Sequence, residues 1–180
     1  MSAVRRQKPA LSDPKPLRVA IGADHGGFAM KGRLIPFLQA KGYEVADLGT
    51  HSAKPCDYPA IGFKVAQAVS RGAFNQGVLL CKSGIGIAIV ANKVPGIRAA
   101  VCNDTFDAKR SRSHNDANLL VLGAEKLGLE ASKRIVKTFF ATRFESGGRH
   151  ERRVKQIASI ERQLFRSQKT EHRSQRTEVR

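Results

Sequence analysis

The sequence has only three cysteines among its 180 residues, and it has no long apolar run. No hydrophobic stretch approaches the roughly 20 residues that a helix needs to cross a bilayer, so we expect no membrane partner. The first ten residues carry charge but no apolar segment, so no signal peptide is visible. Cys56, Cys81 and Cys102 are odd in number and lack metal-binding spacing, which favours a reducing cytoplasm over a disulfide framework.

Acidic residues are also scarce. The chain has 15 Asp and Glu against 32 Lys and Arg, which gives a net charge of +17. Residues 1–18 contribute +4 and residues 149–180 contribute +6. A basic core suits an anionic small molecule, whereas basic ends can touch nucleic acid or membranes non-specifically. The ends lack interleaved aromatic residues and any nucleic-acid module, so we expect them to be solvated and expect no nucleic-acid partner.

The common cofactor signatures are missing. Gly22, Gly26 and Gly27 do not have the spacing of a dinucleotide fingerprint, and no Walker sequence is present. The five histidines show no paired metal spacing. The sequence therefore predicts neither a cofactor nor a bound metal.

The chain length suits one domain, which we place at residues 17–165. We expect residues 1–16 to form a flexible basic arm and residues 166–180 a disordered basic tail. Apolar runs alternate with helical segments, which indicates an α/β protein, a three-layer αβα sandwich with a five-stranded, parallel, Rossmann-like sheet. The predicted strands are 17–23, 43–48, 76–82, 97–102 and 118–122. The predicted helices include 28–40, 60–71, 105–113, 129–142 and 150–165.

The central stretch runs from residue 78 to residue 92. It begins as a buried strand, breaks at residues 83–86 and continues as an apolar helix. Gly84 and Gly86 let the backbone bend and approach a ligand, and such a turn directs N–H groups at an anion. Cys81, at the end of the strand, faces the same space, where the helix start favours a thiolate. The alternative is that Cys81 is a small buried residue beside an ordinary turn.

Ligands of parallel sheets bind at the carboxyl ends of the strands. This rule gathers Asp24 and His25 after the first strand with Cys81 and Ser83 after the third. The rule does not directly place His114 and Asn115, which we expect in a polar turn at residues 114–116 just before the fifth strand. We expect these residues to converge at one edge of the sheet.

The gathered side chains have complementary chemistry. His25, Arg149 and Arg153 are candidates to bind phosphate, since the two arginines lie one helical turn apart. Cys81 is a candidate base and His114 an acid or base near neutrality. Ser83 is suited to carry a proton between neighbouring oxygens, and the amides of residues 84–88 to stabilise an oxyanion. Taken singly, each has a simpler explanation as a cap, a loop histidine or a surface charge.

The motifs together resemble one family. They are Gly-Ala-Asp-His-Gly-Gly-Phe at 22–28, Asp-Tyr-Pro at 57–59, Cys-Lys-Ser-Gly-Ile-Gly at 81–86, Ala-Asn-Lys at 91–93, Gly-Ile-Arg-Ala at 96–99, Ser-His-Asn-Asp-Ala-Asn at 113–118 and Gly-Gly-Arg-His-x-x-Arg at 147–153. From about residue 18 to residue 161 the chain resembles the ribose-5-phosphate isomerase B family, which groups with the galactose-6-phosphate isomerase subunits.

The resemblance implies an isomerase that interconverts aldose and ketose phosphates through a cis-enediolate, without metal or cofactor. By resemblance, Cys81 removes the proton, Ser83 assists proton movement and His114 opens the sugar ring. Asp24, Tyr58 and Asn115 bind hydroxyls; His25, Arg149 and Arg153 hold phosphate. The implied enediolate-binding residues are Gly84, Ile85, Gly86, Ile87 and Ala88.

The resemblance also implies a homodimer, or a tetramer, whose active sites are shared, with His114 and Asn115 supplied by the partner subunit. One residue departs from the pattern. Lys82 stands where members with a cysteine base usually have glycine. Ribose 5-phosphate is the expected substrate, and other four- or six-carbon sugar phosphates remain open. The alternative from a different class is a non-catalytic protein that binds a sugar phosphate or nucleic acid.

Overall fold

The computed structural model describes residues 16–178, with side chains as far as residue 165. Its centre is a sheet of five parallel strands in the order β2-β1-β3-β5-β4. The strands are β1 (Arg18–Ala23), β2 (Glu44–Asp47), β3 (Gln76–Cys81), β4 (Ala99–Val101) and β5 (Leu119–Gly123). The predicted three-layer α/β fold is confirmed, with strand ends that differ from prediction by at most two residues.

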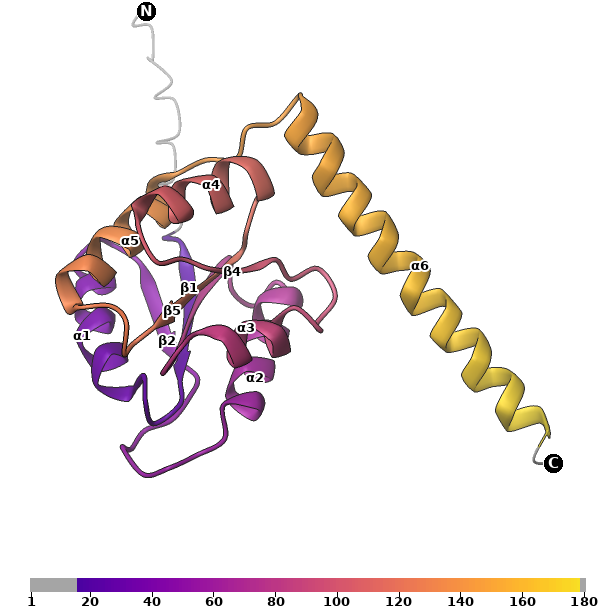
Figure 1. The fold of residues 1–180 in the computed structure, drawn as a ribbon, viewed down its shortest axis with the longest axis horizontal. Helices are drawn as coiled ribbons and strands as arrows, with labels where there is room; N and C mark the ends of the chain where they lie inside the picture. The colour runs from indigo at the N-terminus through magenta and orange to yellow at the C-terminus, as the bar shows by residue number, and fades with distance from the viewer. Residues whose placement is uncertain (1–15, 179–180) are drawn as a thin grey trace, which may run out of the picture.

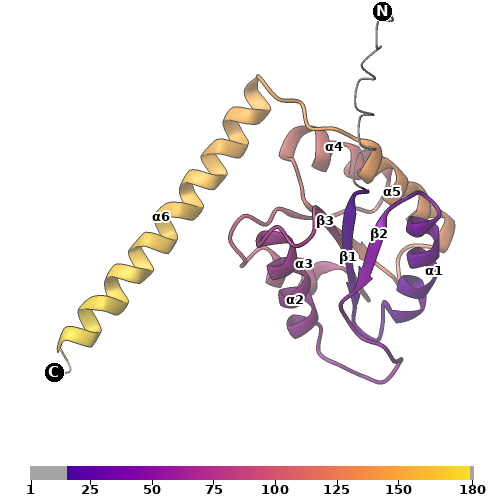
Figure 2. The same cartoon turned by 180° about the vertical axis from the view of Figure 1, so that it is seen from behind.

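The helices form the outer layers (Figures 1 and 2). Helices α1 and α5 pack on one face of the sheet and α2 and α3 on the other, while α4 packs against α5. Helix α6 runs outward from the body and contacts it chiefly through α4. The bounds are α1 (Phe28–Gln39), α2 (Tyr58–Ser70), α3 (Ile85–Ala91), α4 (Thr105–Asn115), α5 (Leu129–Ala141) and α6 (Arg149–Glu178).

Strand β3 lies at the middle of the sheet and is buried along its whole length. A parallel strand covered by helices on both faces is apolar at every position, which explains the run of apolar residues before Cys81. Alternate residues enter different cores. Val78 and Leu80 pack with the α1 and α5 side, and Leu79 and Cys81 pack with the α2 and α3 side. The side chain of Cys81 therefore faces α3.

The strand order places a topological switch between β1 and β3. The chain passes from β1 to β2 on one side of the sheet and later returns to β3 on the other side of β1. The crevice beyond the carboxyl ends of two such strands is where open α/β sheets bind ligands. Asp24 and Cys81 lie at these two strand ends.

Helix α4 is longer than the sequence predicted. The predicted N-cap is confirmed, because the Asp107 N–H donates to Asp104 Oδ1 at 2.8 Å. The helix then continues through His114 and Asn115, which were expected in a turn. It ends at Asp116, whose φ of +46° is left-handed. The guanidinium groups of Arg98 and Arg112 donate to the Asp116 carboxylate at 2.7 and 2.8 Å and hold that conformation.

The C-terminal segment also differs from prediction. Helix α6 continues to Glu178, although residues 166–180 were expected to lack regular structure. The polar composition that suggested disorder is rich in Arg, Lys, Glu and Gln, which are good helix formers. The predicted arm, residues 1–16, lies outside the described residues except for Pro16. Within the described chain, no helix combines the length and apolar character that a membrane crossing requires.

Candidate active site

The turn after β3 brings a thiol, a hydroxyl and several amides together. Gly84 has a φ of +82°, a left-handed conformation that favours glycine, and it directs the chain from β3 into α3. The Gly84 N–H donates to Cys81 Sγ at 3.1 Å, and the Ile85 N–H donates to Ser83 Oγ at 3.3 Å. The thiol therefore lies against a backbone N–H group at the start of α3.

Not all five predicted anion-binding amides are available. Those of Gly84 and Ile85 are engaged by the thiol and the hydroxyl, and the Ala88 N–H donates to the Gly84 carbonyl at 3.3 Å. Among the described residues, the Gly86 and Ile87 N–H groups have no hydrogen-bond acceptor. The structure thus leaves two donors at the start of α3 for an oxyanion.

Tyr58 closes one side of this turn. It is the first residue of α2, and its side chain is 37% exposed. A Cβ atom on Gly86 would lie 2.6 Å from Tyr58 Cζ and 2.7 Å from its hydroxyl oxygen. The phenol therefore rests directly on the backbone of α3, beside the unpaired amides, and Gly86 is the residue that makes this approach sterically allowed.

The turn after β1 contributes Asp24 and His25. Asp24 is 5% exposed, and its Oδ1 accepts from the Gly27 N–H at 3.0 Å, which closes the turn into α1. His25 Nδ1 lies 3.2 Å from both the backbone N–H and the carbonyl oxygen of Cys56. The loop between β2 and α2 therefore fixes the imidazole ring and leaves its Nε2 for a ligand.

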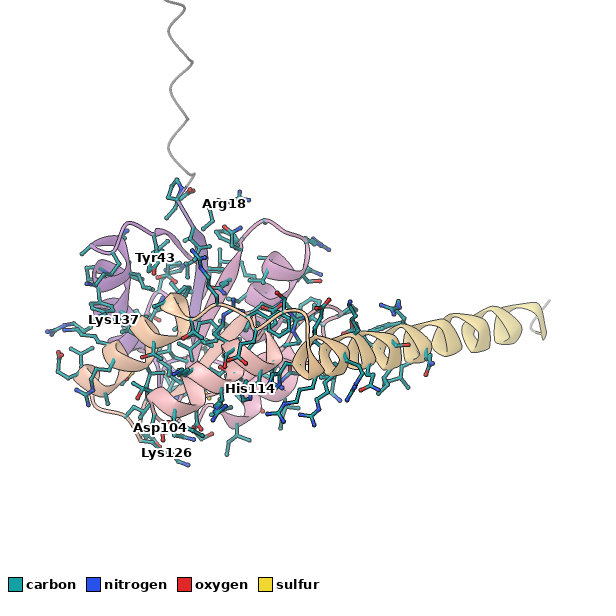
Figure 3. All side chains as sticks on the ribbon, turned by 90° about the horizontal axis from the view of Figure 1, so that it is seen from above. Arg18, Tyr43, Asp104, His114, Lys126 and Lys137 are labelled. Atoms are coloured by element: carbon teal, nitrogen blue, oxygen red, sulfur yellow. The ribbon has the colours of Figure 1, made fainter. Side chains whose placement is uncertain are left out.

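A second group forms at the other end of the protein. His114 lies in the last turn of α4, and Arg149, His150 and Arg153 lie in the first turns of α6. The rings of His114 and His150 stack with centroids 3.8 Å apart, and Arg110 Nη1 lies 2.6 Å from His114 Nε2. Figure 3 shows His114 beside the start of α6.

Burial lowers the pKa of His150 below its ordinary value, and the nearby charges of His114 and Arg149 lower that pKa further. Its Nε2 faces the Arg149 Nε atom at 3.4 Å. His150 is therefore neutral over a wider pH range than an exposed histidine.

The two groups lie at opposite edges of the sheet within one chain. Helix α4 begins after β4, at the carboxyl edge, and ends before β5, at the amino edge. Its 11 residues span about 16 Å, which is too far for His114 to reach Cys81. The expectation that all these residues converge at one edge of a single chain is therefore wrong for His114, Asn115 and the two arginines. Their supply by a partner subunit stays a prediction.

The comparison with known proteins decides the family. A sequence model described as Ribose/Galactose Isomerase matches residues 19–157. Ribose-5-phosphate isomerase B of Escherichia coli (strain K12) is 44% identical over 144 residues, which cover 80% of this chain and 96% of that protein. This chain belongs to the ribose/galactose isomerase family.

Other members of the isomerase family are similarly close. D-erythrulose-4-phosphate isomerase of Pectobacterium atrosepticum is 42% identical over 136 residues, covering 73% of this chain and 88% of that protein. The structure of ribose-5-phosphate isomerase B from Clostridium thermocellum matches with a TM-score of 0.80 at 48% identity, covering 82% of this chain and 99% of that one. The chain is thus a sugar-phosphate isomerase.

Sequence reasoning missed a buried lysine behind the isomerase site. Lys31 is 1% exposed, and its Nζ donates to the Asp47 carboxylate and to the carbonyl oxygens of Gly49 and Thr50. These bonds anchor the start of the loop between β2 and α2, and the Cys56 backbone near the end of this loop contacts His25. A lysine within the apolar pattern of α1 is the sequence signal, but the pattern does not identify its partners.

Lys82, the departure from the family pattern, points away from the isomerase's thiol. Its aliphatic stem covers Gly26, where an added Cβ would lie 2.4 Å from Lys82 Cγ. Its Nζ lies 3.7 Å from Glu125, and both side chains are more than half exposed. Because neighbouring residues of a strand face opposite sides of the sheet, Lys82 lies across from Cys81.

The other two cysteines of the isomerase differ from Cys81. Burial raises the pKa of the Cys102 thiol to about 11, although the Ser111 hydroxyl 3.7 Å away partly opposes the shift. Cys56 is partly exposed and belongs to the loop that holds His25. All three cysteines are free.

Proposed function

We propose that this isomerase interconverts ribose 5-phosphate and ribulose 5-phosphate through a cis-enediolate, with Cys81 as the base. The observation that carries the proposal is the position of the Cys81 thiol at the switch point, in the same turn as the Gly86 and Ile87 N–H groups, which have no hydrogen-bond acceptor among the described residues. A base and an oxyanion site in contact are what proton abstraction next to a carbonyl requires.

The proposed reaction moves one carbon-bound proton. The Cys81 thiolate takes the proton from C2 of the open-chain aldose, and the Gly86 and Ile87 N–H groups stabilise the charge that develops on O1. Ser83 Oγ carries a proton from O2 to O1, and the Cys81 thiol returns its proton to C1, which leaves a carbonyl at C2. One oxyanion donor is worth about 2.7–4 kcal/mol. Two such donors therefore contribute more than the factor of roughly 10²–10⁴ typical of a base.

A homodimer would complete the site. The two groups of predicted residues lie too far apart within one chain, and apolar side chains are exposed on both α6 and α3. Between α6 and the body lies a groove of about 820 Å³ with α6 side chains on one wall. We propose that a second copy fills this groove and brings its His114, Asn115, Arg149 and Arg153 to Cys81. The exposed apolar residues are Ile157, Ile160, Leu164 and Phe165 on α6 and Ile85 and Ile89 on α3.

The presence of His114 favours a pentose over a tetrose. A tetrose 4-phosphate has its 4-hydroxyl esterified and cannot close a five-membered ring, so it needs no ring opening. A pentose 5-phosphate forms a furanose and does need it. An acid–base group such as His114 is therefore useful for the pentose.

The experiment measures turnover of ribose 5-phosphate, erythrose 4-phosphate and allose 6-phosphate by the wild type, Cys81→Ala and His114→Asn. We expect ribose 5-phosphate to be preferred, Cys81→Ala to lose turnover of every substrate, and His114→Asn to lose ribose turnover but keep erythrose turnover. Cys102→Ser is the matched cysteine control. Absence of turnover for all four- to six-carbon sugar phosphates would refute the proposed reaction.

Mixing two inactive variants tests the shared site. If His114 acts on the partner's Cys81, a heterodimer of Cys81→Ala and His114→Asn contains one intact site. Random re-association then restores about a quarter of the wild-type ribose 5-phosphate activity. No recovery after verified subunit exchange would show that each site is built by one chain.

A further inference from the structure

Helix α6 carries a line of basic residues along its C-terminal half. Residues 162, 166, 169, 173 and 176 are spaced alternately four and three residues apart, and each of them is an arginine or a lysine. In a helix this spacing places successive members about one turn apart on the same side. The line spans about 21 Å, because each residue adds about 1.5 Å to a helix. We call Arg162, Arg166, Lys169, Arg173 and Arg176 the basic stripe.

The basic stripe lies on the side of α6 that is turned away from the groove. The groove side is identified by Glu161, whose carboxylate accepts from the Gly96 N–H at 2.9 Å, and by Ile157 and Leu164, which line the groove. At about 100° per residue, the mean direction of these three residues differs from that of the stripe by about 130°. Arg162 is exposed, and α6 runs clear of the body (Figures 1 and 2). A second copy in the groove would therefore leave the stripe accessible.

The acidic residues of α6 lie off the stripe. Glu151 pairs with Lys155 at 2.5 Å, and Glu161 is engaged with the body. Glu171 and Glu178 each stand two residues after a member of the stripe, which puts them about 160° around the helix from it. Within the described helix, the stripe therefore presents five positive charges in a row with no acidic residue among them.

This arrangement depends on the helix. The segment beyond residue 165 was expected to be disordered, so its charges had no defined positions and the basic end was expected only to be solvated. In the helix that continues to Glu178, the same charges form a row. A row of cations matches an anion whose charge repeats along its length, because a single small anion would meet only one or two of them.

We propose that the basic stripe binds the phosphate backbone of duplex nucleic acid without reading its sequence. Four of its five members are arginines, whose planar guanidinium groups pair well with phosphate oxygens. Single-strand sites also use aromatic side chains for stacking, and residues 166–178 contain no Phe, Tyr or Trp. A membrane surface fits less well, because an interfacial helix needs apolar residues, and this segment has none. The inference goes beyond the proposed isomerase reaction and does not depend on it.

The test measures binding of the full-length protein to a labelled DNA duplex of about 20 base pairs, which is about 70 Å long and exceeds the stripe. Fluorescence anisotropy is recorded over a series of salt concentrations, with vesicles containing phosphatidylserine as the comparison. The key variant exchanges charges within α6 through Lys169→Glu, Glu171→Lys, Arg176→Glu and Glu178→Arg. It keeps the composition and net charge but moves two cations off the stripe and two acids onto it. Circular dichroism checks the helix content.

A second pair of variants decides the question if the exchange disturbs the helix. Lys169→Gln with Arg176→Gln removes two charges from the stripe, and glutamine keeps a high helix propensity. Lys41→Gln with Lys54→Gln is the matched control, because it removes two exposed lysines of the body and leaves the same net charge. The stripe predicts weaker binding by the first variant, whereas an effect of net charge alone predicts equal binding by both.

We expect the logarithm of the wild-type binding constant to fall with the logarithm of salt concentration with a slope of about −4.5, since each of five phosphate contacts contributes about −0.9. The charge exchange removes two contacts, so the slope should become about −2.7 and binding at low salt at least tenfold weaker. Equal binding by the wild type and the charge-exchange variant would overturn the proposal, as would no salt-dependent binding by the wild type. Tighter binding to the vesicles than to the duplex would assign the stripe to a membrane surface instead.

Discussion

Replacing Gly86 by alanine separates the stability of the isomerase from its activity. The added methyl group would lie 2.6 Å from Tyr58 Cζ, 2.7 Å from its hydroxyl oxygen and 2.9 Å from Cε2. Carbon atoms pack at about 3.5–4.0 Å, so the phenol must move by roughly 1 Å. Gly86 keeps its N–H in this variant, so the oxyanion donor is unchanged.

The substitution should lower kcat/KM without a matching fall in the free energy of unfolding. A displacement of about 1 Å at a positioning group costs on the order of 10²-fold in rate, or about 2.7 kcal/mol in transition-state stabilisation. Alanine is favoured over glycine inside a helix by up to about 1 kcal/mol, so the free energy of unfolding should not fall by an amount that explains the loss. We therefore expect kcat/KM for ribose 5-phosphate to drop about 100-fold in a folded protein.

The assay combines steady-state kinetics with urea unfolding. Gly32→Ala is the matched control, because Gly32 lies inside α1 and an added Cβ meets nothing within 4 Å. In a Tyr58→Ala background the Gly86→Ala change should have no further effect on kcat/KM, since the clash is removed. A Gly86→Ala enzyme that folds normally and keeps kcat/KM within twofold of wild type would refute the placement of Tyr58 at the substrate.

Three further predictions concern single side chains. Arg149→Ala and Arg153→Ala should each raise KM for the phosphorylated sugar at least tenfold, since a hydrogen bond to a charged group is worth about 1.5–3 kcal/mol. The control is Arg152→Ala, which removes an exposed neighbouring arginine and should leave KM unchanged. Lys82→Gly should leave the ratios of kcat/KM for four-, five- and six-carbon sugar phosphates within twofold of wild type, because the exposed ion pair of Lys82 with Glu125 is worth only about 0–1 kcal/mol. A larger change in these ratios would assign Lys82 a role in substrate specificity. With a pKa of about 11, the Cys102 thiol should resist iodoacetamide at pH 8 in the native protein and react with it in urea. Mass spectrometry measures the alkylation, and a native protein alkylated at Cys102 would contradict the burial of this side chain.

The pKa of His150 gives a prediction for stability. Because its pKa is lowered in the folded state, the unfolded chain binds a proton more readily. The free energy of unfolding should therefore fall as the pH drops below about 6.5, the ordinary histidine value, and His150→Asn should reduce this slope. An identical pH dependence in both proteins, measured by urea titration between pH 5 and pH 8, would contradict the assignment.

The sequence predicted the local elements well. Buried strands such as β3 and the glycine turn after it are recognisable because apolar runs and glycines act on neighbouring residues only. The same reasoning placed Asp24 and Cys81 at the carboxyl ends of the first and third strands, and the sheet order shows that these two strands are neighbours. It failed at the end of α4, because Asp116, held by the distant Arg98 and by Arg112 of the same helix, terminates the helix two residues later than the polar residues suggested.

Contacts between distant segments were decided by the tertiary structure alone. His114 and His150 lie far apart in the sequence, yet the packing of α6 against α4 stacks their rings. The direction of α4 also carries His114 to the edge of the sheet opposite Cys81, although sequence order suggested a single edge. The sequence by itself determined which residues carry the chemistry and which local element holds each one, since those properties depend on side-chain type and near neighbours. Which residues meet depends on how helices cross and pack, and that is set by the whole core at once.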